Sequence, residues 1–455
     1  MSMPSKRGVK SRKSDEVLKR LDKSVANSVR ALYYPIAVKE AHDFTVTDVD
    51  GRSYLDFNAS WTVAGVGYSN PEVARAVEAE FRRNGGVAAG TFPGELTARF
   101  AERLIELTPG KFEKKVWFGH SGSDACDAPF KMLPPATKRP RVLSFFGSMH
   151  GVDVGGMAMA GHPATSKYPI PTLATKVPYA YCYRCPFGLE FPSCGIYCGG
   201  DFIEDHVFKY VNPPEDTSFV MVEPIQSDSG DIIPPPGYLE KLKKICDKHG
   251  ILFVVDEVKV GFGRTGKMFA TEYSKGVIPD GISLGKSISS GVPVGAFVAR
   301  KDLVDTGFAL STLSGNAVGA AAGLATIDYI EKKRLPENAA KIGAHLLKLL
   351  MELKSKYEIV GDVRGKGLIM GIEFVKDRKT KAPARMETVK IVYRAWQLGL
   401  LTVFVGADSN VMEITPPLTI TREAVERGAG IIEQSIKDMQ SGLVPDSLVA
   451  RFTGF

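Results

Sequence analysis

Five short apolar segments, separated by stretches with helical periodicity, constrain the fold of this chain more than any other feature. They span residues 115–119, 141–145, 218–222, 251–255 and 295–298. Most are nearly continuous apolar runs, which is typical of strands buried on both faces of a sheet. Strands that alternate with helices predict an α/β fold with a doubly wound, mostly parallel sheet. Such sheets bind ligands beyond the carboxyl ends of their strands, so we expect functional residues there.

The pattern changes on both sides of this region, which predicts a second, smaller domain. Residues 35–57 alternate in the strand period, with a turn at 48–51, and indicate a short antiparallel sheet. A charged helical stretch at 327–356 leads into a region of mixed helices and strands. We therefore expect a tail and part of a small domain in 1–65, a large domain in 66–330, and a small α+β domain in 331–455.

Composition and charge exclude several kinds of partner. No stretch of the 455 residues approaches 18 uninterrupted apolar side chains, so no membrane-spanning helix is expected. The basic N-terminus lacks the apolar segment of a secretory signal, which favours a cytoplasmic protein. The net charge of +7 lies largely in this tail, and no basic stripe is interleaved with aromatic residues. We therefore expect a small-molecule partner, with no nucleic acid and no membrane.

Two ionisable residues follow neighbouring apolar runs and point to one cofactor. Asp256 ends the run 251–255, and Lys286 follows a second short apolar run. Pyridoxal 5'-phosphate needs a lysine that bonds to its aldehyde and a carboxylate that holds its pyridinium nitrogen. A lysine desolvated in such a pocket is also an activated nucleophile and base. The pair predicts pyridoxal 5'-phosphate; a surface lysine beside a glycine-rich turn is the alternative for Lys286.

A second group of candidate ligands is a cluster of cysteines. Four of the six cysteines lie within 17 residues, at Cys182, Cys185, Cys194 and Cys198. The spacing C-x2-C-x8-C-x3-C suits a tetrahedral zinc ion on a small loop. Two disulfides are a second interpretation, although they are unusual in a cytosolic chain. Four reduced thiols without a metal are the third, and the sequence leaves the three open.

Three consecutive segments are similar to a known family. ILFVVDEVKVGFGRTGKMFA at 251–270, PDGISLGK at 279–286 and TLSGNAVGAAAGLATI at 312–327 resemble the class III aminotransferases, a branch of the fold-type I pyridoxal-phosphate enzymes. The resemblance extends from about residue 34 to the C-terminus. It implies the fold-type I architecture, with the cofactor bound in the large domain.

The resemblance also implies roles in cofactor binding. Gly122 and Ser123, in a turn from strand to helix, match the residues that bind the phosphate, as suits a helix N-terminus. Such turns also occur without a ligand. Asp256 matches the partner of the ring nitrogen, and Val258 matches the apolar residue under the ring. Thr312 matches a threonine that reaches the phosphate of the neighbouring subunit, which implies a homodimer with shared active sites.

Several positions depart from the family pattern. Lys259 stands where many members have glutamine near the ring hydroxyl. Met149 stands where the family stacks an aromatic side chain on the ring, and methionine offers a looser contact without a hydroxyl. His150 is expected to be structural. Three prolines within 129–135 fall in an expected helix; because a mid-helix proline costs about 3 kcal/mol, we expect this helix to be kinked or shortened.

Asp228 favours racemization over transamination. A racemase removes a proton from one face of the cofactor and returns it on the other, which takes two acid/base groups. Lys286 is one, and Asp228, in EPIQSD, is the candidate second where many class III aminotransferases carry glutamate. This stretch resembles the racemases of the family, of the α-amino-ε-caprolactam racemase and isoleucine 2-epimerase types. Trp61 matches a tryptophan that walls their substrate pocket. A structural acid and an ordinary core aromatic are the alternatives.

Glu413 indicates the class of substrate. In this family an arginine for the substrate α-carboxylate typically lies a few residues before a Pro-Pro-Leu motif, and here that position is Glu413. A carboxylate beside a carboxylate is repulsive, which disfavours free amino acids. An arginine from elsewhere, such as Arg385 or Arg394, is the alternative source of a positive charge.

These observations lead to one principal hypothesis about function. We expect a pyridoxal-phosphate-dependent racemase that inverts Cα of an α-amino lactam or an amino-acid amide. An aminotransferase with an ω-amino or α-amino donor is the second hypothesis. A non-catalytic protein that keeps the fold is the third, and Met149 with the proline-interrupted helix is its only support.

Overall fold

The computed structural model describes residues 12–165, 168, 170, 172–305, 309–452 and 454. The chain divides into two compact units, one of residues 71–337 and one of residues 1–70 with 338–455. The expected domain boundaries, after residues 65 and 330, lie a few residues before these divisions. Each unit is described by itself.

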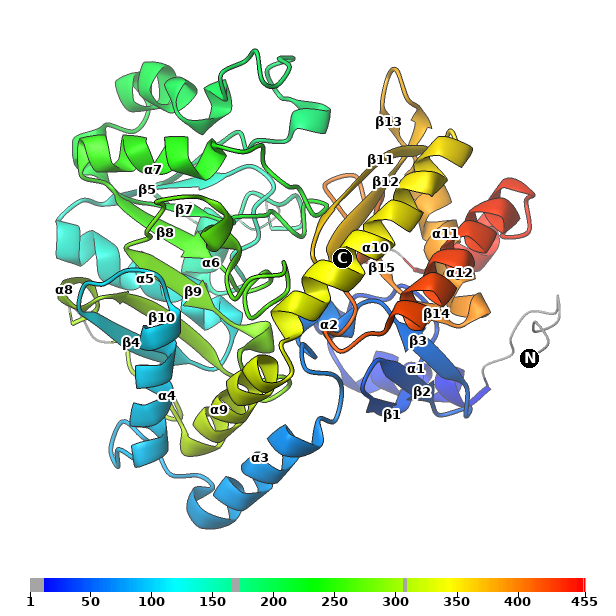
Figure 1. Ribbon diagram of the computed structural model, residues 1–455, viewed down its shortest axis with the longest axis horizontal. Helices are drawn as coiled ribbons and strands as arrows, with labels where there is room; N and C mark the ends of the chain where they lie inside the picture. Colours follow the sequence, from blue (N-terminus) through cyan, green and yellow to red (C-terminus); the bar gives the residue numbers. More distant parts are fainter. Residues whose placement is uncertain are drawn as a thin grey trace. The chain divides into compact units, whose positions relative to one another are not determined.

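The unit 71–337 is built around a seven-stranded sheet in the order β4-β10-β9-β8-β7-β5-β6 (Figure 1). Neighbouring strands from β6 to β9 are parallel, and β10 is antiparallel to both of its neighbours. This topology confirms the predicted α/β fold with a mostly parallel sheet. The strands are β4 (Lys114–Gly119), β5 (Arg141–Phe145), β6 (Ala174–Val177), β7 (Thr217–Val222), β8 (Leu252–Asp256), β9 (Gly281–Leu284) and β10 (Gly295–Arg300).

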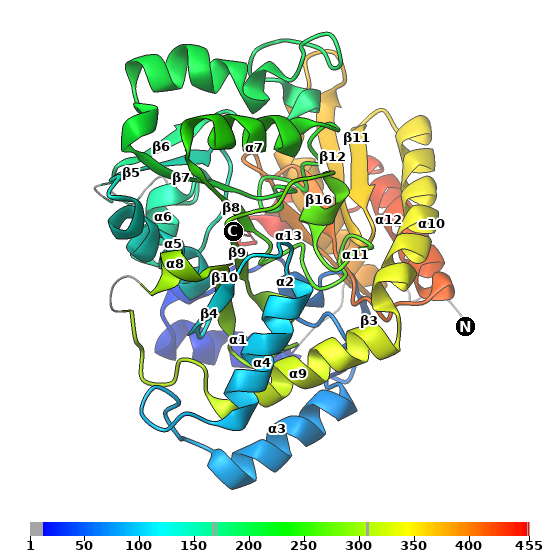
Figure 2. The same cartoon turned by 60° about the vertical axis from the view of Figure 1, so that its left-hand side comes forward.

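Helices cover both faces of this sheet. On one face, alternate residues of β7 and β8 pack against α5 (Gly122–Thr137) in one apolar cluster. On the other face, Phe145 contacts Tyr238 of α7 (Tyr238–His249) edge to face, so α5 and α7 lie on opposite sides of the strands (Figure 2). The remaining helices of this unit are α3 (Pro71–Asn84), α4 (Glu95–Leu107), α6 (Val154–Met159), α8 (Lys301–Val304) and α9 (Ala317–Lys332).

The prolines of α5 do not shorten it, which corrects one part of the expectation of a kinked or shortened helix. The helix runs for 16 residues through Pro129, Pro134 and Pro135. Pro129 has no N–H for the carbonyl of Ala125, four residues earlier. The hydroxyl of Ser283 donates to that carbonyl instead, at 2.8 Å. A side chain from β9 therefore replaces the missing backbone bond, and burial of the helix against the sheet stabilises the rest.

The unit 1–70 with 338–455 contains two further sheets. One has the order β1-β2-β3-β14, and its first three strands form the antiparallel sheet expected in residues 35–57. The other has the order β11-β12-β16-β15. The strands are β1 (Val38–His42), β2 (Thr45–Asp48), β3 (Ser53–Asp56), β11 (Val360–Lys366), β12 (Ile369–Asp377), β13 (Ala382–Pro383), β14 (Leu400–Leu401), β15 (Val403–Val405) and β16 (Val411–Ile414).

Amphipathic helices accompany these sheets. They are α1 (Arg12–Ser24), α2 (Ala59–Thr62), α11 (Arg385–Leu398), α12 (Arg422–Gln440) and α13 (Asp446–Val449), and α10 (Leu335–Lys356) crosses the division between the units. Within the described ranges, no helix has the length and apolar character needed to cross a membrane.

Candidate active site

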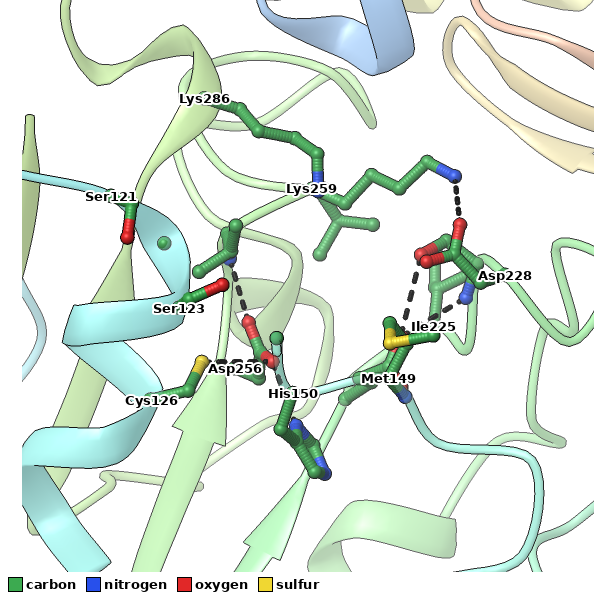
Figure 3. A pocket seen from close by; sticks show the side chains of 16 residues that line it. Ser121, Ser123, Cys126, Met149, His150, Ile225, Asp228, Asp256, Lys259 and Lys286 are labelled. Carbon is green, nitrogen blue, oxygen red and sulfur yellow. Dashed lines mark hydrogen bonds and ion pairs between the residues drawn. The ribbon is translucent and has the colours of Figure 1, made fainter. Parts of the chain in front are cut away.

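One pocket in the unit 71–337 collects most of the residues expected to bind the cofactor (Figure 3). It lies where β4, β5, β7, β8 and β9 end, at the carboxyl edge of the sheet. The expected residues that line it are Gly122, Ser123, Met149, Asp228, Asp256, Val258, Lys259 and Lys286. The pocket thus lies at the edge of the sheet where the pattern of apolar strands predicts that a ligand binds.

The N-terminus of α5 forms one wall of the pocket. Ser121 caps this helix, because its hydroxyl accepts the N–H of Asp124 while the Asp124 carboxylate accepts the N–H of Ser121. Gly122 has no room for a side chain, since a Cβ there would lie 2.5 Å from Cγ1 of Val258. The first N–H groups of a helix have no partner within the helix and attract anions. Small residues thus leave this end of the helix open to a phosphate.

Asp256 lies at the base of the pocket, buried at the end of β8. Its Oδ1 accepts the N–H of Val258 at 3.0 Å. Its Oδ2 lies 2.8 Å from Nδ1 of His150 and accepts the thiol of Cys126 at 3.3 Å. Three contacts from three chain segments fix this carboxylate. The position of His150 agrees with its expected structural role. No pattern in the sequence connects Cys126 with Asp256, since the two residues are far apart in the chain.

Lys286 enters the pocket from the loop after β9 (Figure 3). Its backbone has φ of 48°, a left-handed conformation that is costly for a residue with a side chain. The preceding Gly285 packs against the neighbouring loop, because a Cβ there would lie 2.8 Å from Cα of Gly122. Close packing at Gly285 holds the strained turn that presents Lys286.

Asp228 and Lys259 form an ion pair in the same pocket. Nζ of Lys259 lies 2.8 Å from Oδ1 of Asp228, and the two side chains are 5% and 21% exposed. Burial alone would raise the pKa of Asp228, but the positive charges of Lys259 and Lys286 outweigh it and lower this pKa to about 2. Asp228 is therefore ionised at neutral pH.

Glu223 is a pocket residue that the sequence argument did not single out. Its Oε1 accepts the N–H of Met149 at 2.9 Å, and its Oε2 accepts the N–H of Ser227 at 3.1 Å. Burial raises the pKa of Glu223 to about 7. The side chain thus joins the segment of Met149 to the segment that carries Asp228. Its place in the EPIQSD motif was the only signal in the sequence.

The residues of this pocket fit pyridoxal 5'-phosphate. An ionised carboxylate offers about four acceptor positions, so three contacts leave Asp256 capacity for a ring nitrogen. Gly122, Ser123 and the end of α5 suit the phosphate, and Lys286 is the amine that the aldehyde requires. Val258 and Met149 add apolar contacts to the lining of the pocket.

Two residues expected to bind the substrate lie in the other unit. Trp61 is 38% exposed and lies in a run of four residues with positive φ, from Ala59 to Thr62. It lines a separate hollow of its own unit, together with Tyr34 and Asp56. Glu413 is fully buried in β16, where it pairs in register with Gly371 of β12 and Val403 of β15. The roles of Trp61 and Glu413 in substrate binding remain predictions.

Thr312 and the cysteine loop lie outside the pocket. Thr312 is exposed in the turn before α9, and its contact with a second subunit remains a prediction. Cys182, Cys185, Cys194 and Cys198 are all described, and all four are free thiols. Burial is the main cause that raises the pKa of Cys198, and the other three thiols of the loop raise it further. This effect indicates that the four thiols lie near one another. The choice between zinc and free thiols stays open.

Comparison with known proteins agrees with the site. The family model of the class III aminotransferases matches residues 25–436. Leucine/methionine racemase of Thermococcus litoralis is 38% identical over 95% of this chain and 98% of its own. Alanine/serine racemase of Pyrococcus horikoshii is 37% identical, over 96% and 93%. Isoleucine 2-epimerase of Lentilactobacillus buchneri is 34% identical, over 95% and 96%.

Solved structures are similar over the same length. An aminotransferase of Bacillus anthracis has a TM-score of 0.86 and 27% identity, over 94% of this chain and all of the other. A PLP-bound amine transaminase of an uncultivated Pseudomonas species has a TM-score of 0.80 and 29% identity, over 92% and 97%.

The fold and the pocket define a fold-type I enzyme that uses pyridoxal 5'-phosphate. The chain belongs to the class III aminotransferase family. Among its relatives are racemases and an epimerase as well as transaminases.

Proposed function

We propose that the protein is a racemase that inverts Cα of an α-amino lactam or an amino-acid amide. The observation that carries this proposal is that Asp228 and Lys286 line one pocket from two separate loops. Inversion needs one acid/base group on each side of the cofactor plane, whereas transamination needs only one. The pocket offers both groups beside Asp256, which suits the ring nitrogen.

The proposed mechanism divides the work between these residues. Pyridoxal phosphate, when bound, withdraws electrons from Cα and makes its hydrogen acidic. Asp228 is ionised and accepts this proton from one side, while Lys286, as an ammonium group, delivers a proton from the other and becomes the neutral amine. The roles exchange for the opposite enantiomer. Asp256 keeps a proton on the ring nitrogen, and the end of α5 holds the phosphate.

The identity of the relatives supports racemization. Three proteins that share 34–38% of their residues with this chain are named as racemases or an epimerase. An aminotransferase is the second candidate function, because the similar solved structures are named as an aminotransferase and an amine transaminase. A homodimer, with Thr312 reaching the partner's phosphate site, is part of the proposal for either reaction.

The substrate class rests on Glu413. By the family resemblance this residue replaces the arginine that binds an α-carboxylate, and a negative charge there favours an uncharged amide or lactam carbonyl. The racemases among the relatives are named for free amino acids, which favours those as the competing substrates. Free amino acids carry an ionised α-carboxylate, whereas amides and lactams do not. A direct comparison of a free amino acid with its own amide therefore decides between the two substrate classes.

The test is incubation of the holoenzyme with an enantiopure amino-acid amide in D2O. Racemization gives the opposite enantiomer with deuterium at Cα and no keto product. Lys286→Ala should lose both this reaction and the absorbance band of lysine-bound pyridoxal phosphate. A keto product with stoichiometric pyridoxamine phosphate would instead establish transamination.

A matched pair of variants isolates the second acid/base group. Asp228→Asn should slow inversion by about 100-fold or more, the typical contribution of a general acid or base. Exchange of the Cα hydrogen without inversion, by Lys286, should persist. Asp247→Asn changes an exposed aspartate and serves as the control. Inversion at the wild-type rate in Asp228→Asn would show that the two-base assignment is wrong.

A further inference from the structure

One ion pair in the pocket joins Asp228 to a lysine other than Lys286. Nζ of Lys259 lies 2.8 Å from Oδ1 of Asp228, and its side chain is only 5% exposed (Figure 3). Lys259 follows β8, whereas Asp228 follows β7, so the pair bridges two adjacent parallel strands at their carboxyl ends. The ammonium group of Lys259 thus lies beside the carboxylate of Asp228, which the proposed reaction uses.

A buried ammonium group is costly unless it is paired, and truncating one partner of such a pair leaves the other charge uncompensated. The groups that act on Asp228 come from three other segments: Lys259 after β8, Lys286 after β9, and His162 after α6. Lys286 is the residue that bonds to the aldehyde. Lys259 is therefore the lysine in direct contact with Asp228 that takes no part in the covalent chemistry.

We propose that Lys259 is a positioning residue that keeps Asp228 ionised and fixes its Oδ1, which leaves Oδ2 to exchange the proton with Cα. This inference rests on the proposed function, because it gives Asp228 its acid/base role. The low pKa of Asp228, about 2, agrees with it. The glutamine that many relatives carry at this position is neutral and cannot supply the same charge.

The ion pair gives a physical reason for a lysine at position 259, where many class III aminotransferases have glutamine. The proton that Asp228 accepts neutralises its carboxylate, and the ammonium of Lys259 then favours return of that proton. A carboxylic acid beside a fixed positive charge is a stronger acid than one in an apolar pocket. The pair therefore makes Asp228 a better donor once it has accepted the proton.

The experiment measures the protonation of Asp228 directly, in the apoprotein. The side-chain carboxyl signal of ¹³C-labelled aspartate is followed against pH by NMR, with Asp228→Asn to assign it. In the wild-type protein Asp228 should not titrate down to about pH 4, the ordinary pKa of an aspartate. In Lys259→Met its pKa should rise by about 1–3 units, the usual effect of removing an adjacent opposite charge.

Matched variants separate charge from packing. Lys259→Arg keeps the charge and should retain the low pKa, whereas Lys259→Gln removes the charge with a polar side chain and should raise it. Lys275→Met, an exposed lysine in the same unit, should leave the titration unchanged. An unchanged Asp228 titration in both Lys259→Met and Lys259→Gln would overturn the proposal. A rise of the pKa in Lys259→Arg as large as in Lys259→Met would also overturn it.

Kinetics of the holoenzyme complete the test. Inversion of an amide should fall about tenfold or more in Lys259→Met and recover in Lys259→Arg, since a general acid or base contributes about 100-fold or more. The two readouts separate the two proposals. If Asp228→Asn leaves inversion intact, the proposed function fails, while the NMR titration still reports on the pairing. If Asp228→Asn abolishes inversion and the Lys259 variants change neither readout, only the inference about Lys259 fails.

Discussion

Nδ1 of His150 lies 2.8 Å from Oδ2 of Asp256, and both side chains are buried. Together with the thiol of Cys126, this contact fixes the carboxylate that we propose for the cofactor ring. A charge held in place before the ligand arrives costs no rearrangement on binding. The pair therefore connects the loop after β5 to the binding of pyridoxal phosphate.

His150→Ala should weaken binding of the cofactor more than it weakens the fold. Loss of a hydrogen bond to a charged group costs about 1.5–3 kcal/mol, which is about tenfold or more in the dissociation constant. Retention of pyridoxal phosphate during dialysis, read by absorbance, measures the effect. Cys126→Ala removes the weaker thiol contact and should cost less. Equal retention in wild type and His150→Ala would contradict the assigned role.

Glu223 should make the stability of the apoprotein depend on pH. Burial raises its pKa in the folded protein to about 7, above its ordinary value of 4.5, so the folded state binds the proton more tightly. The resulting stabilisation is fully present below the unfolded pKa and is lost as the pH rises through about 7. The free energy of unfolding should therefore fall as the pH rises from the ordinary to the raised pKa of Glu223, by about 3 kcal/mol.

Glu223→Gln should reduce this dependence on pH. The amide is neutral at every pH, and it keeps one acceptor for the N–H groups of Met149 and Ser227, so a constant cost should accompany a flatter slope. Urea unfolding of the apoprotein between about pH 4 and pH 8 measures both, because this range contains the unperturbed and the raised pKa values. Glu215→Gln, at an exposed position, is the control. The same slope in wild type and Glu223→Gln would assign the pH dependence to other groups, such as Glu257, whose pKa burial also raises to about 7.

Amides and lactams should react faster than the matching free amino acids. Burying the α-carboxylate of a free amino acid without a cationic partner costs several kcal/mol, and about 1.4 kcal/mol is a factor of ten. We therefore expect kcat/KM for amides and lactams to exceed that for free amino acids by about a hundredfold or more. Glu413→Gln removes the negative charge with little change in volume and should narrow the gap by improving the free acid. A wild-type preference for free amino acids would show that Glu413 does not set the substrate class.

Ser283 and Pro129 should be coupled in stability. Ser283→Ala removes the donor to the buried carbonyl of Ala125 and should cost about 1–3 kcal/mol. In Pro129→Ala the backbone regains an N–H for the same carbonyl, so the cost of Ser283→Ala should be smaller there. Urea unfolding of the four proteins forms a double-mutant cycle. Additive costs would show that Ser283 does not replace the missing backbone bond.

The sequence by itself determined the type of fold and the position of the site. Runs such as 251–255 are apolar throughout because both faces of a parallel strand are buried, and this pattern is readable without the structure. Asp256 and Lys286 follow two such runs, and β8 and β9 are neighbours in the sheet. Strand β6 was not predicted, because most of its residues are only partly buried and they form no continuous apolar run.

Only the tertiary structure decided which side chains contact one another in the pocket. Three hydrogen bonds of the pocket join residues that are far apart in the chain. They link Cys126 to Asp256, Glu223 to Met149, and Lys259 to Asp228, which are 130, 74 and 31 positions apart. Local periodicity carries no information about such contacts, because they depend on how strands are ordered in the sheet and which loops meet at its edge. The same holds for α5. Its prolines predicted a kink or a shortening, and a hydroxyl from β9 supplies the bond that the helix lacks.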